Sequence, residues 1–323
     1  MEKVNHASAD AVPDAKYNPP FVSLDAVRRA TEMIFSTSIG DTEARREAMK
    51  TLEEANMHCT PEEYTDFYQS GLELSAKEIA NAVERQPILY FYEAAFEKIK
   101  REMEATAPAP GAVILWHVYN MGYVVKTRNE CFAIDLHHRR GEELIPQLDF
   151  LLVTHDHTDH HTERLLEGVM RAGKPVVSNF YPRGVPRPEN PDPLEIGTAK
   201  IHTAITDHNP KLRRFVQTYE IELTADGRKA VIFSGGDSCD PGQFSIHSPG
   251  VDVFIVHPRD GLDVAEAQSV LNPRLTLISH LLEMGHRFDR FRWSYEIGFW
   301  EMARSRRNGR RCTVPLWGDR IEI

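Results

Sequence analysis

Residues 150–161 of the chain read FLLVTHDHTDHH, and the expected fold follows from this stretch. Its first four residues are apolar, as in a buried strand, and its last seven hold four histidines and two aspartates. In an extended or turning backbone, residues two apart point to the same side, so His155 and His157 can converge on one metal ion. Asp159 and His160 then turn toward a second ion. The stretch therefore predicts a strand that presents a loop of metal ligands.

The overall composition is that of a globular protein. The chain has 323 residues, 41% apolar and 27% charged, which is enough for one large domain or two smaller ones. Its four cysteines have no paired spacing, which argues against a disulfide framework and a thiolate zinc site. With 48 acids against 38 bases the net charge is −10, so no nucleic-acid partner is expected. Histidine stands out, because thirteen of the fifteen lie between His117 and His286.

The sequence also bears on location. No window approaches the roughly 18 to 20 uninterrupted apolar residues of a membrane helix, so no membrane partner is expected. Residues 1–14 lack the basic flank and apolar core of a signal peptide. We therefore expect a cytoplasmic protein.

The apolar pattern divides the chain into two parts. In the first part the apolar residues recur at helical steps, so each helix offers one apolar face. Thr60 before Pro61 predicts one helix start, and Ser75 with Glu78 predicts another through a capping box. A stretch rich in alanine, proline and glycine then ends this part. We predict an N-terminal helical region at 1–104, a linker at 105–111 and a catalytic domain at 112–323.

After the linker the period changes. Short β-branched runs bounded by turns alternate with a few helical stretches, such as 163–171 and 264–270. This mixture predicts a layered α/β sandwich. The strand-like runs are 112–118, 123–127, 131–136, 150–154, 176–178, 200–205, 215–223, 230–234, 251–256 and 275–279.

The motif at 155–160 resembles the hallmark of the metallo-β-lactamase-fold hydrolases, His-x-His-x-Asp-His at the end of a strand. The resemblance covers about residues 112–286 and implies an αββα sandwich, here with an N-terminal helical extension. It also implies hydrolysis by a hydroxide that two metal ions hold. Within the superfamily, Thr-His-Asp-His-x-Asp-His and Ser-Gly-x-Asp-Ser look closest to the branch that includes L-ascorbate-6-phosphate lactonase and related phosphodiesterases.

The resemblance implies further site residues, each after a strand-like run. Asp135 looks like the aspartate that supports the ligands from behind. One ligand should lie between the end of the motif at His161 and Asp237, where His202 and His208 are the only histidines. We favour His208 because it follows a strand-like run, although the family commonly has glycine where Asp207 precedes it here. The implied set is His155, His157 and His208 for the first metal, Asp159, His160 and His280 for the second, and Asp237 as the bridge.

Other residues near the motif are candidates for catalysis. Besides Asp159, His257 and His286 are interpreted as catalytic: His257 as a proton donor or substrate contact, His286 at the rim of the pocket. A surface histidine is the alternative for His257. His137 and His138 are more simply interpreted as solvated turn residues.

The segment after His286 is basic. Residues 287–311 hold eight arginines against three acids, and guanidinium groups bind phosphate and carboxylate well. We predict that Arg287 and Arg290, together with Arg292, contact an anionic substrate, and that the other arginines form a solvated helix face.

Together these features predict a dinuclear metal-dependent hydrolase, of phosphodiesterase or lactonase type, acting on a small anionic ester, phosphodiester or lactone. Two divalent ions are expected, Zn²⁺ first and Mn²⁺ or Fe as alternatives. A mononuclear non-haem iron oxygenase or sulfur dioxygenase on the same fold is the rival. A scaffold with a structural metal is disfavoured, because such zinc sites are closed by four protein ligands. The N-terminal helices should pack against the catalytic domain or join a homo-oligomer.

Overall fold

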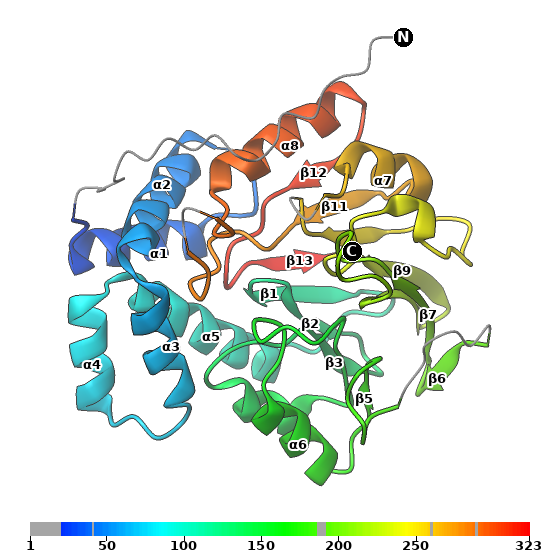
Figure 1. The fold of residues 1–323 in the computed structure, drawn as a ribbon, viewed down its shortest axis with the longest axis horizontal. Helices are drawn as coiled ribbons and strands as arrows, with labels where there is room; N and C mark the ends of the chain where they lie inside the picture. Colours follow the sequence, from blue (N-terminus) through cyan, green and yellow to red (C-terminus); the bar gives the residue numbers. More distant parts are fainter. Residues whose placement is uncertain (1–20, 41, 186–191, 259–260, 288–289) are drawn as a thin grey trace.

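Two β-sheets packed face to face form the centre of the protein (Figure 1). The computed structural model describes residues 21–40, 42–185, 192–258, 261–287 and 290–323, so the N-terminal stretch considered for a signal peptide lies outside it. One sheet has the order β13-β1-β2-β3-β4-β5, and the other β12-β11-β10-β9-β8-β7-β6. The strands are β1 Ile114–Tyr119, β2 Gly122–Lys126, β3 Cys131–Ile134, β4 Phe150–Leu152, β5 Val176–Val177, β6 Leu194–Ile196, β7 Ala199–Thr206, β8 Val216–Ala225, β9 Arg228–Ser234, β10 Val253–Val256, β11 Leu275–Ile278, β12 Cys312–Thr313 and β13 Arg320–Glu322.

The space between the sheets is a dry apolar core. Leu115, Tyr123 and Phe132 of the first sheet share one buried cluster with Ile221 and Ile232 of the second. Successive residues of a strand point to opposite faces, so the alternate residues face the helices outside. Burying one such side chain contributes about 1.5–3 kcal/mol.

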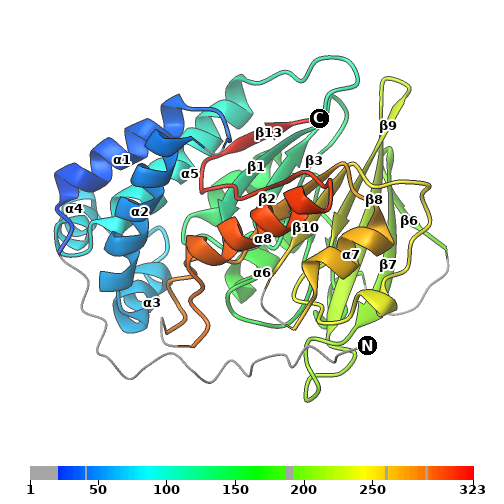
Figure 2. The same ribbon diagram turned by 90° about the horizontal axis from the view of Figure 1, so that it is seen from above.

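Helices cover the outer faces of both sheets. Helices α5 and α6 contact the first sheet, while α7 and α8 lie on the side of the second (Figure 2). The predicted αββα sandwich with an N-terminal helical extension is therefore confirmed. Among the described residues, no helix is both long and apolar enough to cross a bilayer. The helices are α1 Leu24–Ser36, α2 Glu43–His58, α3 Pro61–Gln69, α4 Ala76–Arg85, α5 Ile88–Ala105, α6 Glu163–Arg171, α7 Val264–Leu271 and α8 Tyr295–Arg307, with short 3₁₀ turns η1 Gly141–Gln147 and η2 Pro241–Gln243.

The predicted helix starts are confirmed. The Thr60 side chain accepts a hydrogen bond from the backbone N–H of Glu63, whose carboxylate accepts one from the backbone of Thr60. Ser75 and Glu78 make the same reciprocal pair at the start of α4. Each pair satisfies backbone donors that a helix start leaves open.

The N-terminal helices are attached to the sandwich by buried polar contacts as well as apolar ones. The indole Nε1 of Trp116 in β1 donates to Glu102 Oε2 in α5 at 2.8 Å. Arg45 of α2 forms a buried ion pair with Asp319, just before β13. One apolar cluster contains side chains of α1, α2 and α5 together with residues of the first sheet. The apolar faces of these helices therefore pack against one another and against the sandwich of the same chain.

Three strands were not predicted from the sequence. β6, β12 and β13 have only three, two and three residues, which is too short for an alternating pattern to be recognised. β13 nevertheless pairs with β1, placing Ile321 opposite Leu115. These three strands form because the neighbouring strand, which is distant in the sequence or joined by a turn, offers free backbone hydrogen-bonding groups at the edge of the sheet.

Candidate metal centre

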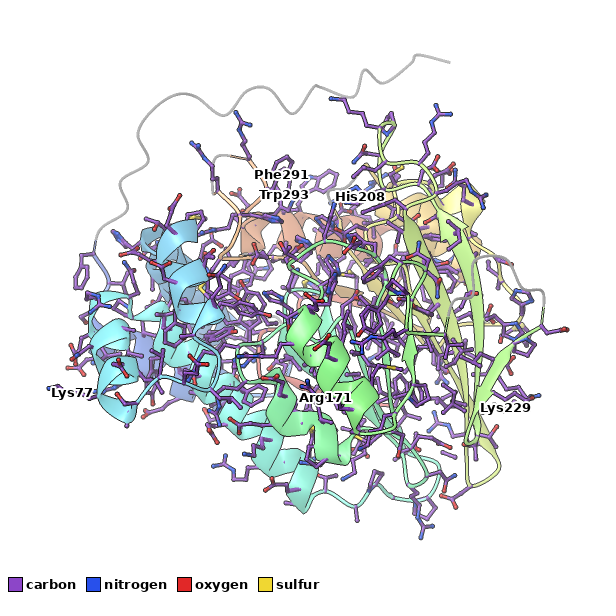
Figure 3. All side chains as sticks on the ribbon, turned by 60° about the horizontal axis from the view of Figure 1, so that its bottom comes forward. Lys77, Arg171, His208, Lys229, Phe291 and Trp293 are labelled. Atoms are coloured by element: carbon purple, nitrogen blue, oxygen red, sulfur yellow. The ribbon has the colours of Figure 1, made fainter. Side chains whose placement is uncertain are left out.

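The strands bring the predicted ligands to one edge of the sandwich. β9, β10 and β11 are parallel, and β7 runs in the same direction because β7 and β9 are both antiparallel to β8. The loops that follow parallel strands meet at the same edge. Figure 3 shows His208, after β7, at this edge, and Lys229, at the start of β9, at the opposite end of the long strands.

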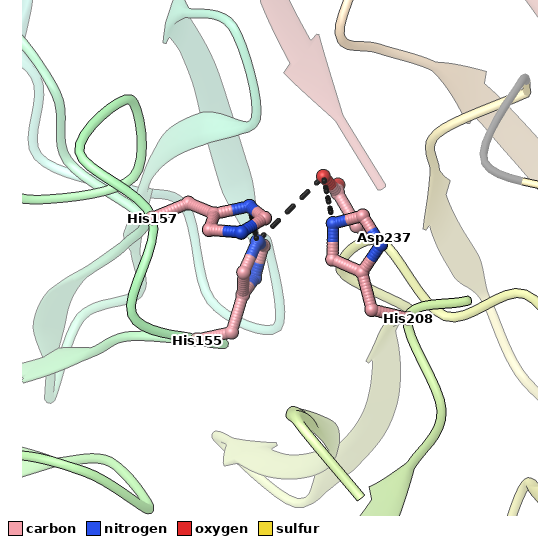
Figure 4. A group of neighbouring side chains, drawn as sticks. All are labelled: His155, His157, His208 and Asp237. Carbon is pink, nitrogen blue, oxygen red and sulfur yellow. Dashed lines mark hydrogen bonds and ion pairs between the residues drawn. The ribbon is translucent and has the colours of Figure 1, made fainter. Parts of the chain in front are cut away.

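The first group of ligands comprises His155, His157, His208 and Asp237, whose ligand atoms lie within 4.8 Å of one another (Figure 4). The Nε2 of His155 is 3.0 Å from His157 Nδ1. Asp237 Oδ2 lies 3.7 Å from His155 Nε2 and 3.8 Å from His208 Nε2. The structure thus brings together the side chains that the sequence assigned to the first metal and the bridge.

The second group comprises Asp159, His160 and His280. His280 Nε2 lies 3.1 Å from Asp159 Oδ2, and His160 Nε2 lies 3.7 Å from the same oxygen. Asp237 Oδ2 is 3.5 Å from His160 Nε2 and 3.6 Å from His280 Nε2. One carboxylate oxygen therefore lies between the two groups, the position expected of a bridging ligand.

His257 joins a third group, with Asp237 and His280. Its ring stacks on that of His280 with centroids 3.9 Å apart, and its Nδ1 lies 3.3 Å from Asp237 Oδ1. The side chain is 6% exposed, so the surface-histidine alternative is wrong. Burial lowers the pKa of His257 to about 4, so the imidazole is neutral near pH 7 and a nitrogen lone pair is available to a metal.

The structure separates the two histidines between which the sequence left a choice. His208 belongs to the first group, whereas His202 Nε2 lies 3.4 Å from Glu222 Oε1 on the neighbouring strand. Asp207, which stands where the family commonly has glycine, fixes the loop after β7 through hydrogen bonds to Gln243. Its carboxylate accepts a hydrogen bond from Gln243 Nε2 at 3.1 Å, and its backbone N–H donates to Gln243 Oε1 at 2.7 Å.

Asp135 supports the ligands from behind. Its carboxylate accepts hydrogen bonds from the backbone N–H and the hydroxyl of Thr154, both at 2.8 Å. The same carboxylate lies 3.0 Å from His160 Nδ1. A proton on Nδ1 then leaves the Nε2 lone pair for the metal. Asp135 has a φ of 44°, a strained conformation for a side chain with Cβ that these contacts hold in place.

Asn120, just before the Gly122 turn, is a positioning residue. Its Nδ2 donates to Asp159 Oδ2 at 3.0 Å and to the Asp159 carbonyl at 3.1 Å. Its own carbonyl accepts the backbone N–H of His280 at 3.2 Å. Asn120 therefore holds the Asp159 side chain and the His280 backbone in place. The sequence alone favours a solvated turn residue at this position, as at His137 and His138, and that interpretation is wrong because Asn120 is buried.

The charges of the cluster fit divalent cations. Burial raises the pKa of Asp237, but His257 and His280 outweigh it and lower the pKa well below its usual value. The carboxylate is therefore charged although it is 3% exposed, and its ion-pair partners among the described residues are all histidines. Burial lowers the pKa of His160, yet Asp159 and Asp135 together raise it well above normal. Two divalent ions on these nitrogen and oxygen donors would stabilise the buried carboxylates.

Replacing Asp135 by asparagine is expected to weaken metal binding by about 10–100-fold while the protein stays folded. The amide keeps an acceptor for Thr154 but offers His160 no negative charge. Titration of apo protein with Zn²⁺ against a competing chelator measures the change. Unaltered affinity would contradict the role assigned to Asp135.

A cavity of about 460 Å³ lies beside the second group. Asp159 and His286 lie in its wall, and α3 forms another part of the wall. The sequence did not predict these α3 contacts, because its tyrosines fit an apolar helix face. The described lining residues are Tyr64, Thr65, Tyr68, Gln69, His137, Thr158, Asp159, His161, Thr162, Glu163, Glu283, Gly285 and His286.

The arginines predicted to contact substrate have different surroundings. Arg292 is 3% exposed, and its guanidinium donates to the carbonyls of Asn56 and Cys59 at 2.8 and 2.7 Å. Its assignment to the substrate is therefore wrong, because carbonyls at the C-terminal end of α2 use its donors. Arg287 and Arg290 are exposed and are not among the described residues that line the cavity, so their contact with substrate stays a prediction.

His137 and His138 are buried, so their interpretation as solvated turn residues is wrong. His137 is 3% exposed and stacks on Tyr68 with ring centroids 4.2 Å apart. His138 is 4% exposed and lies between the rings of Tyr92 and Phe96, at 4.0 and 4.1 Å. Aromatic side chains of the N-terminal helices cover both imidazoles, which the local sequence could not reveal.

No protein-family model and no curated protein matches the chain. A possible metal-dependent hydrolase from Veillonella parvula matches with 13% identity and a TM-score of 0.50, over 66% of this chain and 99% of that protein. CmlA, a diiron β-hydroxylase from Streptomyces venezuelae, matches with 14% identity and a TM-score of 0.50, over 79% of this chain and 62% of CmlA. A Thermotoga maritima structure described as belonging to the metallo-β-lactamase superfamily matches with 12% identity and a TM-score of 0.35, over 57% and 82%.

At these identities the likeness concerns the fold. Two mixed sheets between helices, with the His-x-His-x-Asp-His loop at the end of a strand, give this chain the metallo-β-lactamase fold, and the match at a TM-score of 0.50 agrees with this architecture. The predicted fold is therefore confirmed.

Proposed function

We propose that this protein is a hydrolase that uses two divalent metal ions to cleave a small ester, phosphodiester or lactone. The observation that carries the proposal is the position of Asp237 Oδ2, within 3.5–3.8 Å of four histidines from both groups. Two bound ions supply a nucleophile at neutral pH by lowering the pKa of a water, and they polarise the scissile bond. The nitrogen and oxygen donors suit Zn²⁺ first, with Mn²⁺ or Fe as alternatives.

The chain itself would hold and orient the substrate. Asp159 and Asp237 bring negative charge to the ions, and Asn120 keeps Asp159 in place. His286 is 32% exposed, lines the cavity, and has its Nε2 4.0 Å from Asp159 Oδ2. In this proposal His286 contacts the substrate and gives a proton to the leaving group.

The test begins with metal content and hydrolysis. We expect two ions per chain by elemental analysis of gently purified protein, because the ligand set exceeds what one tetrahedral ion uses. Bis(p-nitrophenyl) phosphate, simple esters and phosphorylated lactones are then assayed with added Zn²⁺ or Mn²⁺. Chelation should abolish turnover, and readdition of metal should restore it. A ratio that stays at or below one ion per chain after reconstitution would contradict the dinuclear proposal.

An oxygenase is the second candidate, because the match with CmlA covers 79% of this chain. Residues 112–323 make up about two thirds of the chain, so that match extends into the N-terminal helical region. Iron in the purified protein, with oxygen consumption and no hydrolysis, would favour this candidate. Zinc or manganese with hydrolysis would exclude it.

A further inference from the structure

The cavity beside the second metal group is aromatic and acidic. Tyr64 and Tyr68 of α3 lie in its wall, together with Glu283 from the loop after β11. The described residues that line it include three carboxylates, in Asp159, Glu163 and Glu283, and neither lysine nor arginine. Because Asp159 belongs to the metal ligands, the two glutamates are the carboxylates of the described lining that remain for a bound molecule.

Glu283 is buried with one oxygen unused. The residue is 1% exposed, and its Oε1 accepts hydrogen bonds from the Tyr119 hydroxyl and the Gly285 N–H, both at 2.9 Å. Its Oε2 has no hydrogen-bond partner among the described residues. Its ion-pair partner among the described residues is His286, whose Nδ1 lies 3.4 Å from Oε2 without hydrogen-bond geometry. A buried carboxylate oxygen in this state is costly unless a ligand supplies a donor.

We propose that the cavity binds a primary ammonium group of the substrate, with Glu283 Oε2 as the acceptor. An ammonium and a buried carboxylate form a charge-assisted hydrogen bond, and the aromatic side chains of Tyr64 and Tyr68 in the wall favour the carbon chain that carries the ammonium. An anionic group would be repelled by Glu163 and Glu283. This inference rests on the proposed function and narrows its substrates to amine-bearing esters, lactones or phosphodiesters.

The distances also limit the size of the substrate. The His286 ring spans the gap between Glu283 Oε2, at 3.4 Å from Nδ1, and Asp159 Oδ2, at 4.0 Å from Nε2. The ammonium site and the metal ligands are thus separated by little more than one imidazole. The bond to be cleaved and the amine must therefore lie a few atoms apart.

The test measures binding without turnover. The metal-loaded full-length protein is titrated by calorimetry with 2-phenylethylamine, 2-phenylethanol and 3-phenylpropionate, which present an ammonium, a neutral and an anionic group. We expect the amine to bind at least about tenfold more tightly than the other two. Glu283→Gln should weaken amine binding by roughly 10–100-fold, since a hydrogen bond to a charged group is lost. The amide retains Oε1 for Tyr119, and metal content should not change.

Two control experiments distinguish binding in the cavity from a change in the overall charge of the protein. Glu62→Gln removes an equal charge from an exposed position of α3 and should leave amine binding unchanged. Thr65→Arg places a cation in the cavity wall and should abolish amine binding, whereas the neutral Thr65→Gln should not.

Equal amine affinity in the unchanged protein and in Glu283→Gln would overturn the inference, as would equal losses for all three probes. If amine binding depends on Glu283 but no ester, lactone or phosphodiester is hydrolysed, the inference stands and the proposed function fails. If the protein hydrolyses these substrates with two metals but shows no preference for the amine, the proposed function stands and the inference fails.

Discussion

Replacing Asp237 by asparagine is expected to remove bound metal and activity together. An amide carries no negative charge to place between two cations, and Asp237 is the one carboxylate among the described residues that contacts histidines of both groups. We expect metal affinity to fall by at least about 100-fold, since even residues that only orient ligands change it by about 10–100-fold. Elemental analysis and the hydrolysis assay on the same preparation measure both effects.

Asp226→Asn is the matched control for that variant. Asp226 lies in the turn between β8 and β9, far from the site, with a φ of 49° that asparagine tolerates as well as aspartate. Its metal content and activity should equal those of the unchanged protein. Normal metal content and normal turnover in Asp237→Asn would show that the bridge lies elsewhere.

Removing residues 1–104 is expected to make the protein aggregate. The deletion uncovers Trp116 of β1, which is buried in the intact chain and donates to Glu102. It also removes Arg45, the ion-pair partner of Asp319, and the α1, α2 and α5 side chains of the apolar cluster that they share with the first sheet. Size-exclusion chromatography with light scattering measures the outcome, and a soluble, monodisperse and equally active product would contradict the prediction.

A point variant tests the same interface without a deletion. Arg45→Met should destabilise the protein by about 3–5 kcal/mol, because the Asp319 carboxylate stays buried. Arg28→Met is the control, since Arg28 and its partner Asp25 are both exposed and such pairs contribute at most about 1 kcal/mol. Chemical denaturation compares the two variants.

The local sequence was sufficient for the elements that local geometry controls. The apolar run and the histidines at 150–161 predicted both β4 and the ligand loop, because a continuous apolar run forms a buried strand that ends where the polar residues begin. The capping residues at Thr60 and Ser75 predicted where α3 and α4 begin, since a cap acts within three residues of itself. Each of the ten strand-like runs contains a strand, because a short apolar run rich in β-branched residues is itself a local signal.

The composition of the cavity depended on contacts that no local pattern encodes. Asn120 donates a hydrogen bond to Asp159, which lies 39 residues away in the sequence, and Tyr119 donates one to Glu283, which lies 164 residues away. The pairing of β1 with its neighbours and the course of the loop after β11 bring these residues together. From the sequence, Arg292 was predicted to contact an anionic substrate, but in the fold it donates to carbonyls at the C-terminal end of α2.

The layered α/β class and the types of metal-binding side chain could be inferred from the sequence, because strand period and ligand chemistry are properties of short segments, and the resemblance of the motif at 155–160 implied the αββα arrangement. The sequence favoured His208 over His202, and the pairing of β7 with β8 places His208 beside Asp237 and His202 beside Glu222. Long-range packing also makes α3 a wall of the cavity and leaves Glu283 Oε2 there with no hydrogen-bond partner among the described residues. Those features arise from contacts between distant segments, where burial and unsatisfied hydrogen bonds are set by the whole fold.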